Sequence, residues 1–232
     1  MAAALALVLL PQLLCARHLE APGFYLGNHA PPGQATYVMM RPAGLLALSL
    51  LFLQILLGSF GPVLSAWLRV PSLLPLHKAL AIPVLTFAFL HPLLFAQATT
   101  LRKGHPNYLA TFFPDPSQGY WPFYFFFGAL ALYGILAAAL SALVGPRIAP
   151  KGWRVVHGIA YLTFFPACFH ACLTGTDVRD QPLQVLYTLM AGVVACLLTR
   201  RVYGLVRGKG FPGSAGPPEG RKALQGDPGA SS

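Results

Sequence analysis

The chain has 232 residues, of which 56% are hydrophobic and only 9% are charged. A soluble domain carries about 25% charged residues, so this composition excludes an ordinary soluble protein and indicates a membrane protein. The net charge of +10 does not indicate a nucleic-acid-binding protein, because the basic residues lie between apolar segments and in the tail rather than in a stripe with interleaved aromatic residues.

The predicted elements are apolar helices. The first apolar segment, 2–16, is short and contains Pro11. It is either a short first helix, which we favour because the positively charged start of a signal peptide is missing, or a signal peptide. Five longer segments each approach or exceed the roughly 20 residues that span a bilayer, namely 41–60, 75–97, 121–144, 153–174 and 182–203. The sequence therefore predicts an all-α, polytopic membrane bundle of six transmembrane helices, or of five if the first segment is removed.

The expected domain organisation is one transmembrane domain over residues 1–207, with its core at about 40–205. Residues 208–232 are rich in Gly, Pro and Ser and lack apolar periodicity, which predicts a disordered tail. We expect no nucleotide-binding domain after the last span, because the tail is short and no glycine-rich nucleotide motif follows a predicted strand.

The distribution of Lys and Arg predicts the orientation. With six spans and an inside N-terminus, five of the 16 basic residues fall in the outer segments and the other 11 on the cytoplasmic side; the outer five are Arg17, Arg41, Arg102, Lys103 and Arg179. Positive charge is enriched on the cytoplasmic side of membrane proteins. We therefore expect a multi-pass protein of the plasma (inner) membrane, in contact with lipid, with a cytoplasmic C-terminus.

Four of the seven histidines fall in two predicted spans: His77 and His91 in 75–97, and His157 and His170 in 153–174. The first two are 14 residues apart, which returns them to within about 40° of one helix face and separates them by roughly 21 Å along the axis. The second two are 13 residues apart, which in an ideal helix leaves a difference of about 140°. Because Pro166 lies between them, we expect the helix to bend or change its winding there.

The two spans run in the same direction, so each side of the membrane receives one histidine from each span. His77 and His157 are expected near the inner side, and His91 and His170 near the outer side. Two opposed imidazoles are the axial ligands that a haem needs, because the porphyrin fills the other four positions. A zinc site would need four ligands at one level. Lys78 and Arg154 lie beside the inner pair and are candidate partners for haem propionates.

The histidine pattern resembles the ferric reductase-like transmembrane domain superfamily, which includes NADPH oxidases, ferric reductases and the haem-binding subunit of periplasmic methionine sulfoxide reductase. The family carries two histidines on its third helix and two on its fifth, and Trp153, His157, Tyr161 and His170 are similar to its fifth-helix pattern. The resemblance implies two b-type haems, one on His77 and His157 and one on His91 and His170, and it covers roughly residues 40–205. It also implies electron flow from a cytoplasmic donor to an outer acceptor.

The leading hypothesis is therefore a di-haem b-type cytochrome, an oxidoreductase component that receives electrons from a separate flavoprotein or a membrane quinol. Arg102, Lys103 and His105 in the outer loop would attract an anionic ferric chelate, or they are simply solvated loop residues. The second hypothesis is a haem-bearing membrane anchor and electron-input subunit for a periplasmic redox partner. A third, in which the histidines line a path for metal ions or protons, is disfavoured because no Asp or Glu lies in the five long spans.

The four cysteines give no sign of a disulfide or iron–sulfur framework. Cys15, Cys168, Cys172 and Cys196 contain no C-x-x-C pair, and all lie in or beside apolar segments. Cys168 and Cys172 are four residues apart and share a helix face. We interpret all four as small packing residues.

Overall fold

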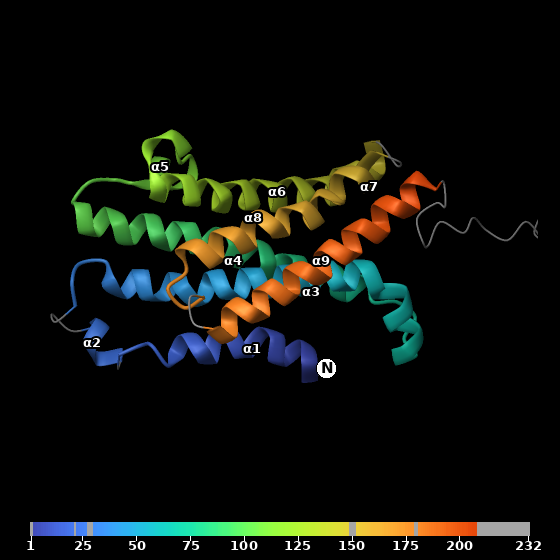
Figure 1. Ribbon diagram of the computed structural model, residues 1–232, viewed down its shortest axis with the longest axis horizontal. Helices are drawn as coiled ribbons and strands as arrows, with labels where there is room; N and C mark the ends of the chain where they lie inside the picture. Colours follow the sequence, from blue (N-terminus) through green and yellow to red (C-terminus); the bar gives the residue numbers. More distant parts are fainter. Residues whose placement is uncertain (1, 21, 27–29, 149–151, 179–180, 208–232) are drawn as a thin grey trace, which may run out of the picture. The chain divides into compact units, whose positions relative to one another are not determined.

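The computed structural model describes residues 2–20, 22–26, 30–148, 152–178 and 181–207. Within these ranges the secondary structure is helical, without a strand, as expected for an all-α protein. The elements, coloured along the chain in Figure 1, are α1 (Ala2–Ala16), α2 (Pro22–Leu26), α3 (Gln34–Leu68), α4 (Leu74–Lys103), α5 (Tyr108–Phe112), the 3₁₀ helix η1 (Pro116–Gln118), α6 (Tyr120–Ile148), α7 (Gly152–His157), α8 (Ile159–Thr174) and α9 (Gln181–Val206).

The chain divides into two units, Met1–Leu198 and Thr199–Ser232. The described part of the second unit is the end of α9 and Arg207. The tail predicted over 208–232 lies outside the described residues. Everything that follows concerns the first unit.

Four helices are long and apolar enough to cross a membrane: α3, α4, α6 and α9. They cover four of the five long segments predicted from the sequence, with longer helices than expected. The shorter apolar helices α1 and α8 have 15 and 16 residues. The fifth predicted segment, 153–174, is not one helix: Gly158 separates α7 from α8. The described helices therefore provide four full-length spans and two shorter apolar helices, rather than the six spans predicted.

The ends of the two longest helices follow local rules. Arg69 ends α3 in the left-handed region (φ 56°), and the N–H groups of Arg69 and Val70 bond the carbonyls of Ala66 and Ser65. Gly104 ends α4 with φ 73°, a conformation that glycine adopts without strain. These two stops give α3 and α4 the length to lie side by side.

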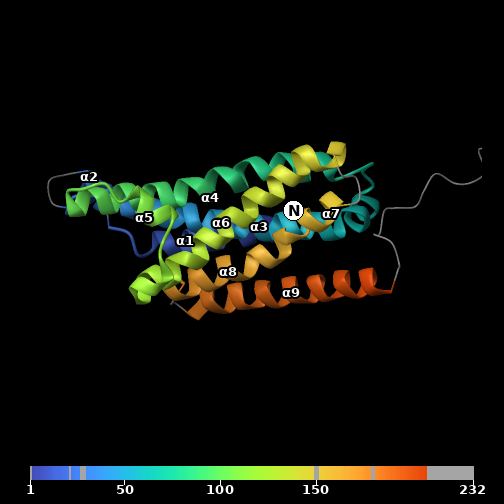
Figure 2. The same cartoon turned by 90° about the horizontal axis from the view of Figure 1, so that it is seen from above.

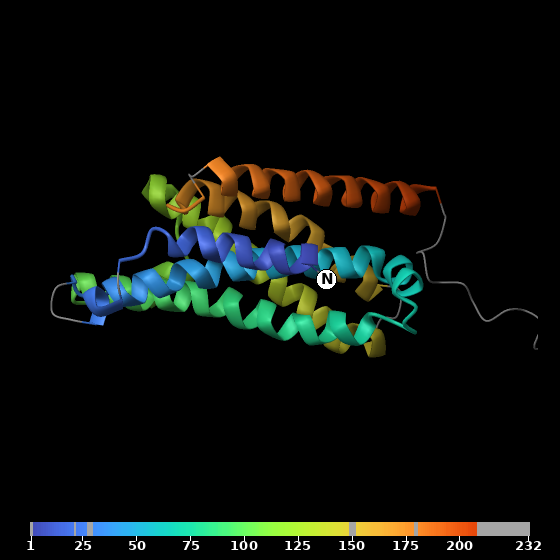
Figure 3. The same ribbon diagram turned by 90° about the horizontal axis from the view of Figure 1, so that it is seen from below.

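Two helix pairs form the frame of the first unit. The most extensive packing joins α3 to α4, and the next joins α6 to α8, with α7 also packed on α6. Figures 1, 2 and 3 show α3 alongside α4 from three directions, and α8 alongside α6. The largest buried side chains between these pairs and α9 include Phe164, Leu183 and Tyr187. This packing fixes α4 against α3 and α8 against α6.

Candidate cofactor-binding site

Each histidine of α4 meets one histidine of the α7–α8 segment. The ring centroids of His77 and His157 are 6.2 Å apart, and those of His91 and His170 are 6.1 Å apart. The rings in each pair stand edge to face, at 70° and 80°. The structure thus makes the two pairings that the sequence predicts; we call them the His77 pair and the His91 pair.

The ring separations match two imidazoles that share one metal ion. With a metal–nitrogen bond of about 2 Å and roughly 1.1 Å from nitrogen to ring centre, two opposed imidazoles on one ion have centroids about 6.2 Å apart. Among the described residues, no group of three or more His, Cys, Asp or Glu side chains is arranged to hold a metal ion. Two ligands without a third suit a cofactor that brings its own equatorial ligands, as a porphyrin does. The residues present therefore fit haem.

Backbone carbonyls orient three of the four rings. Nδ1 lies 2.9 Å from the Met40 carbonyl oxygen in His91, 3.0 Å from that of Ala138 in His157, and 3.0 Å from that of Tyr124 in His170. A carbonyl only accepts, so Nδ1 carries the proton and Nε2 keeps its lone pair. This is the arrangement that metal-binding histidines use to fix the tautomer and the direction of the ring. His77 differs, because its Nδ1 is buried without a partner.

Small residues on the facing helices make room for the rings. A Cβ atom on Gly44 would come within 2.7 Å of His91 Nδ1, and one on Gly128 within 3.0 Å of the same atom of His170. Gly58 faces His77 less closely, at 3.4 Å. Gly44 and Gly128 lie four residues after Met40 and Tyr124, whose carbonyls bond the facing rings, and Gly58 lies four residues after Gln54, whose side chain contacts His77. We call each of these helical turns, which ends at Gly44, Gly58 or Gly128, the seat of the histidine ring that it faces.

The break at Gly158 lies between His157 and His170, whose spacing of 13 residues would point them in different directions on an ideal helix. On α3 the seats Gly44 and Gly58 are 14 residues apart and match the 14 between His77 and His91. On α6 the bonded carbonyls Tyr124 and Ala138 are also 14 apart, whereas the two histidines that they hold are 13 apart.

Tyr161 N–H bonds the Gly158 carbonyl at 3.1 Å, a three-residue bond. A 3₁₀-type step rises about 2.0 Å and turns about 120°, against 1.5 Å and 100° in an α-helix. The larger rise and the larger rotation both act in the direction that brings a spacing of 13 residues closer to the spacing of 14 on α6. The expected change of winding between His157 and His170 is confirmed, but its assignment to Pro166 is wrong: α8 continues through Pro166. Proline is tolerated within membrane helices because neighbouring groups satisfy the freed carbonyl.

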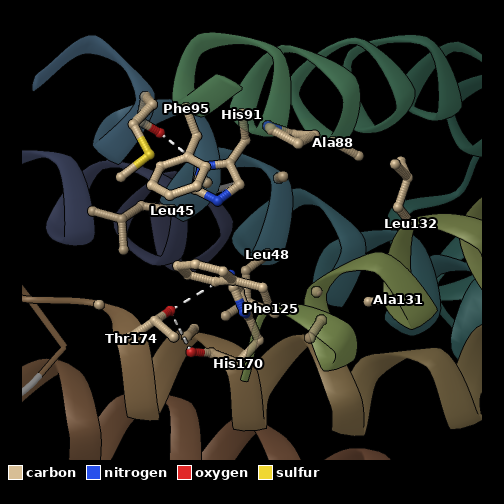
Figure 4. Close-up of a pocket in the computed structure, with 18 of the residues that line it drawn as sticks. Leu45, Leu48, Ala88, His91, Phe95, Phe125, Ala131, Leu132, His170 and Thr174 are labelled. Atoms are coloured by element: carbon tan, nitrogen blue, oxygen red, sulfur yellow. Dashed lines mark hydrogen bonds between the residues drawn. The ribbon is translucent and has the colours of Figure 1, made fainter. Parts of the chain in front are cut away.

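A cavity of about 370 Å³ surrounds the His91 pair. Figure 4 shows His91 and His170 directed into it from opposite sides, with the rings of Phe95 and Phe125 beside them. These two phenyl rings have centroids 5.0 Å apart. The rest of the lining is mostly aliphatic, from α3, α4, α6 and α8. Such a lining excludes water and suits a flat, largely apolar ligand.

One ion pair lines the same cavity. Arg41 Nε donates to Asp177 Oδ2 at 2.8 Å, and a second guanidinium nitrogen bonds Oδ1. The side chains are 13% and 5% exposed. The sequence analysis placed Arg41 in an outer segment and counted it only for topology. The signal that could have found Arg41 is its position three residues before the seat glycine Gly44.

The cations proposed for haem propionates receive no support. Lys78 is exposed at the start of α4, and the side chain of Arg154 lies outside the described residues. In the outer loop, Arg102 donates to Gln34 and lies over the Tyr37 ring, 4.6 Å from its centre, while Lys103 and His105 are exposed. The structure therefore neither assembles nor excludes a chelate site from these three residues.

The predicted packing role fits two of the four cysteines, whereas Cys172 is half-buried and Cys196 is exposed. All four are free, and Cys15 and Cys168 are buried. Cys168 lies 3.5 Å from the Tyr187 carbonyl, as a weak donor between α8 and α9.

Comparison with known proteins places this arrangement in a family. No curated protein and no solved structure matches the chain. The family described as "Ferric reductase like transmembrane component" matches residues 43–168, a range that contains Gly44, both histidines of α4, His157 and the break at Gly158. The match ends two residues before His170, which the ring geometry nevertheless pairs with His91. With its apolar spanning helices, the chain is a multi-pass membrane protein that belongs to the ferric reductase-like transmembrane component family.

Proposed function

We propose that the protein is a di-haem b-type cytochrome that carries electrons across the membrane. The observation that carries this proposal is the pair of histidine couples, with ring centroids 6.2 and 6.1 Å apart. His77 and His157 would hold one haem, and His91 and His170 the other. The 14 residues between His77 and His91 separate the two levels by roughly 21 Å along α4, so together the sites cover much of the bilayer's apolar thickness of about 30 Å.

The chain's own residues would hold and insulate the two centres. Haem iron, when bound, supplies a one-electron redox centre at each level. The carbonyls of Met40, Tyr124 and Ala138 accept from Nδ1 of three imidazoles, which leaves Nε2 of each ring unprotonated and fixes the direction of the ring. The aromatic and aliphatic lining of the cavity keeps water from the His91 pair, which limits side reactions there.

The donor in this proposal is a separate flavoprotein or a membrane quinol, and the acceptor lies on the outer side. This role makes the protein an oxidoreductase component, ferric reductase-like in its membrane domain, with the C-terminus on the cytoplasmic side of the plasma membrane. A role as the membrane subunit of a periplasmic redox partner uses the same two sites and differs only in the acceptor.

Transmembrane electron transfer can be measured in lipid vesicles. Vesicles that contain the purified full chain are loaded with ferricyanide, and dithionite is added outside as the reductant. We expect ferricyanide inside to be reduced faster than in vesicles without protein. His91→Ala should abolish the acceleration, because it removes one of two centres in series.

The matched control is His18→Ala, since His18 is an exposed histidine outside both pairs and outside the predicted chelate site. It should keep the wild-type rate. Equal rates for wild-type and protein-free vesicles would refute transmembrane electron transfer. Addition of a soluble ferric chelate outside then separates direct reduction from a need for a protein acceptor.

A further inference from the structure

Gln54 contacts both the backbone carbonyl and the ring of His77, as Thr174 does at His170, but an amide has two N–H donors where a hydroxyl has one. The side-chain nitrogen of Gln54 donates to the His77 carbonyl at 2.9 Å and lies 3.3 Å from His77 Nε2. Two buried atoms of this contact have no hydrogen-bond partner, His77 Nδ1 and Gln54 Oε1. The amide nitrogen of glutamine has two N–H donors, which is enough for both atoms of His77.

The direction of this hydrogen bond sets the tautomer of His77. Because the amide of Gln54 donates, Nε2 of His77 accepts and the ring proton lies on Nδ1. His77 therefore has the same tautomer as the other three histidines. The difference is the place of the bond: His91, His157 and His170 are held at Nδ1, away from a metal ion, whereas His77 is held at Nε2, the nitrogen that would bind one.

We propose that Gln54 is a positioning residue that competes with the cofactor for His77 Nε2. The inference rests on the proposed haem function and adds a control of occupancy at one site. While the His77 pair is empty, Gln54 bonds Nε2 and holds the ring in place. If the His77 pair held haem, the Nε2 lone pair would be used as an iron ligand, so Gln54 would lose that bond and keep its bond to the His77 carbonyl.

This competition makes the two sites unequal. At the His91 pair, Thr174 Oγ1 lies 3.5 Å from His170 Nε2, but it donates its one proton to the His170 carbonyl at 2.8 Å and has none left for the ring. Binding at the His77 pair must break the Gln54 bond. The His91 pair should therefore fill first when haem is limiting, and the His77 pair should bind more weakly.

The test isolates the His77 pair. In a His91→Ala background, the full chain is prepared from haem-starved cells and titrated with ferric haem b, with binding followed by the Soret absorbance. Gln54→Leu in this background removes the competing donor. We expect the dissociation constant to fall about three- to tenfold, the range that corresponds to one net hydrogen bond. Gln54→Ala should act in the same direction.

The matched control is Gln12→Leu, which removes another buried, unpartnered amide from α1, a helix that carries none of the four histidines. It should leave the dissociation constant unchanged. Tighter binding cannot arise from damage to the fold, so this readout separates competition from a purely structural role. An unchanged or weaker affinity in both Gln54 variants would overturn the competition. If the His91→Ala parent and the wild type bind no haem at all, the proposed function fails instead.

Discussion

The His91 pair joins α4 to α8 and the His77 pair joins α4 to α7, and the two pairs hold their rings differently. At the His91 pair both rings are bonded at Nδ1 to carbonyls, and a Cβ atom on either facing glycine would come within 3.0 Å of a ring. A cavity of about 370 Å³ opens beside them. At the His77 pair only His157 has such a carbonyl bond, and Gln54 bonds the other ring at Nε2. In the proposed function, the His91 pair is therefore preorganised for haem, whereas the His77 pair would have to rearrange before it binds.

Preorganisation of this kind has a measurable consequence. A ring already aimed by a carbonyl loses little freedom when a ligand arrives, so more of the interaction energy appears as affinity. The Gly158 break also lies next to the His77 pair, because His157 is the last residue of α7. The comparison predicts that changes at the His91 pair remove a well-formed site, whereas changes at the His77 pair adjust a weaker one.

The largest expected effect comes from removal of a ligand. His91→Ala and His170→Ala should each abolish one haem, and the same one, because their rings form one pair. The count should fall from two haems per chain to one, with the spectrum of the His77 pair retained. Haem content and low-temperature difference spectra measure this. Loss of the same centre in His91→Ala and His77→Ala would break the assignment.

The next largest effect is expected on haem affinity when a glycine that faces a histidine ring is replaced by alanine. Gly44→Ala would place a methyl group 2.7 Å from His91 Nδ1 and push the ring off the Met40 carbonyl. We expect haem affinity at the His91 pair to fall about 10- to 100-fold, as when an outer partner of a metal ligand is lost.

The control is Gly58→Ala at the other seat. Its Cβ would lie 3.4 Å from His77, an ordinary contact. We expect less than about a threefold change there, since no hydrogen bond is displaced. Equal losses in the two alanine variants, measured by haem titration, would contradict the difference between the seats.

The ion pair beside the His91 pair should contribute to stability. Asp177→Ala leaves Arg41 buried without its partner, which we expect to lower the free energy of unfolding by about 3 kcal/mol. The double variant Arg41→Leu/Asp177→Leu should lose less than either single change, because no unpaired charge remains. Unfolding in detergent measures both. Asp115→Ala, which alters a carboxylate bonded to exposed loop residues, is the control. A double variant that loses as much stability as the two single changes together would show that the two charges do not act as a pair.

The smallest effect is expected at Lys78, the cation assigned from the sequence to the propionates of the His77 pair. Lys78 is exposed, so solvent and salt screen its charge. Lys78→Ala should weaken haem binding at this pair by less than about threefold, and high salt should remove the difference. A tenfold loss that persists at high salt would make Lys78 a direct partner.

The sequence predicted the pairings because histidines in membrane helices are few and their spacing is visible. His77 with His157 and His91 with His170 follow from two parallel spans, and the structure brings those rings together. Haem ligation itself stays a prediction. The approximate positions of α3, α4, α6 and α9 also followed from hydropathy, since a bilayer sets the length of an apolar helix.

Contacts between helices were beyond the sequence. Arg41 was assigned to an outer segment, although it lies inside α3 and pairs with Asp177, 136 residues later. Gln54 and the seat glycines gained no attention, because a polar or small residue in an apolar segment has meaning only once its neighbour is known. Pro166 was expected to change the winding, but Gly158 does so, because the facing helix α6 sets where the change is needed.

The central claim is tested most directly by a haem count on the purified full chain, together with its reduced-minus-oxidised spectrum. The account predicts two b-type haems per chain, with the split α-band or two-step redox titration of unequal centres. It also predicts one haem per chain, bound at the His91 pair, when haem is limiting during expression. A folded preparation that contains no haem, and takes up none on titration, would contradict the account.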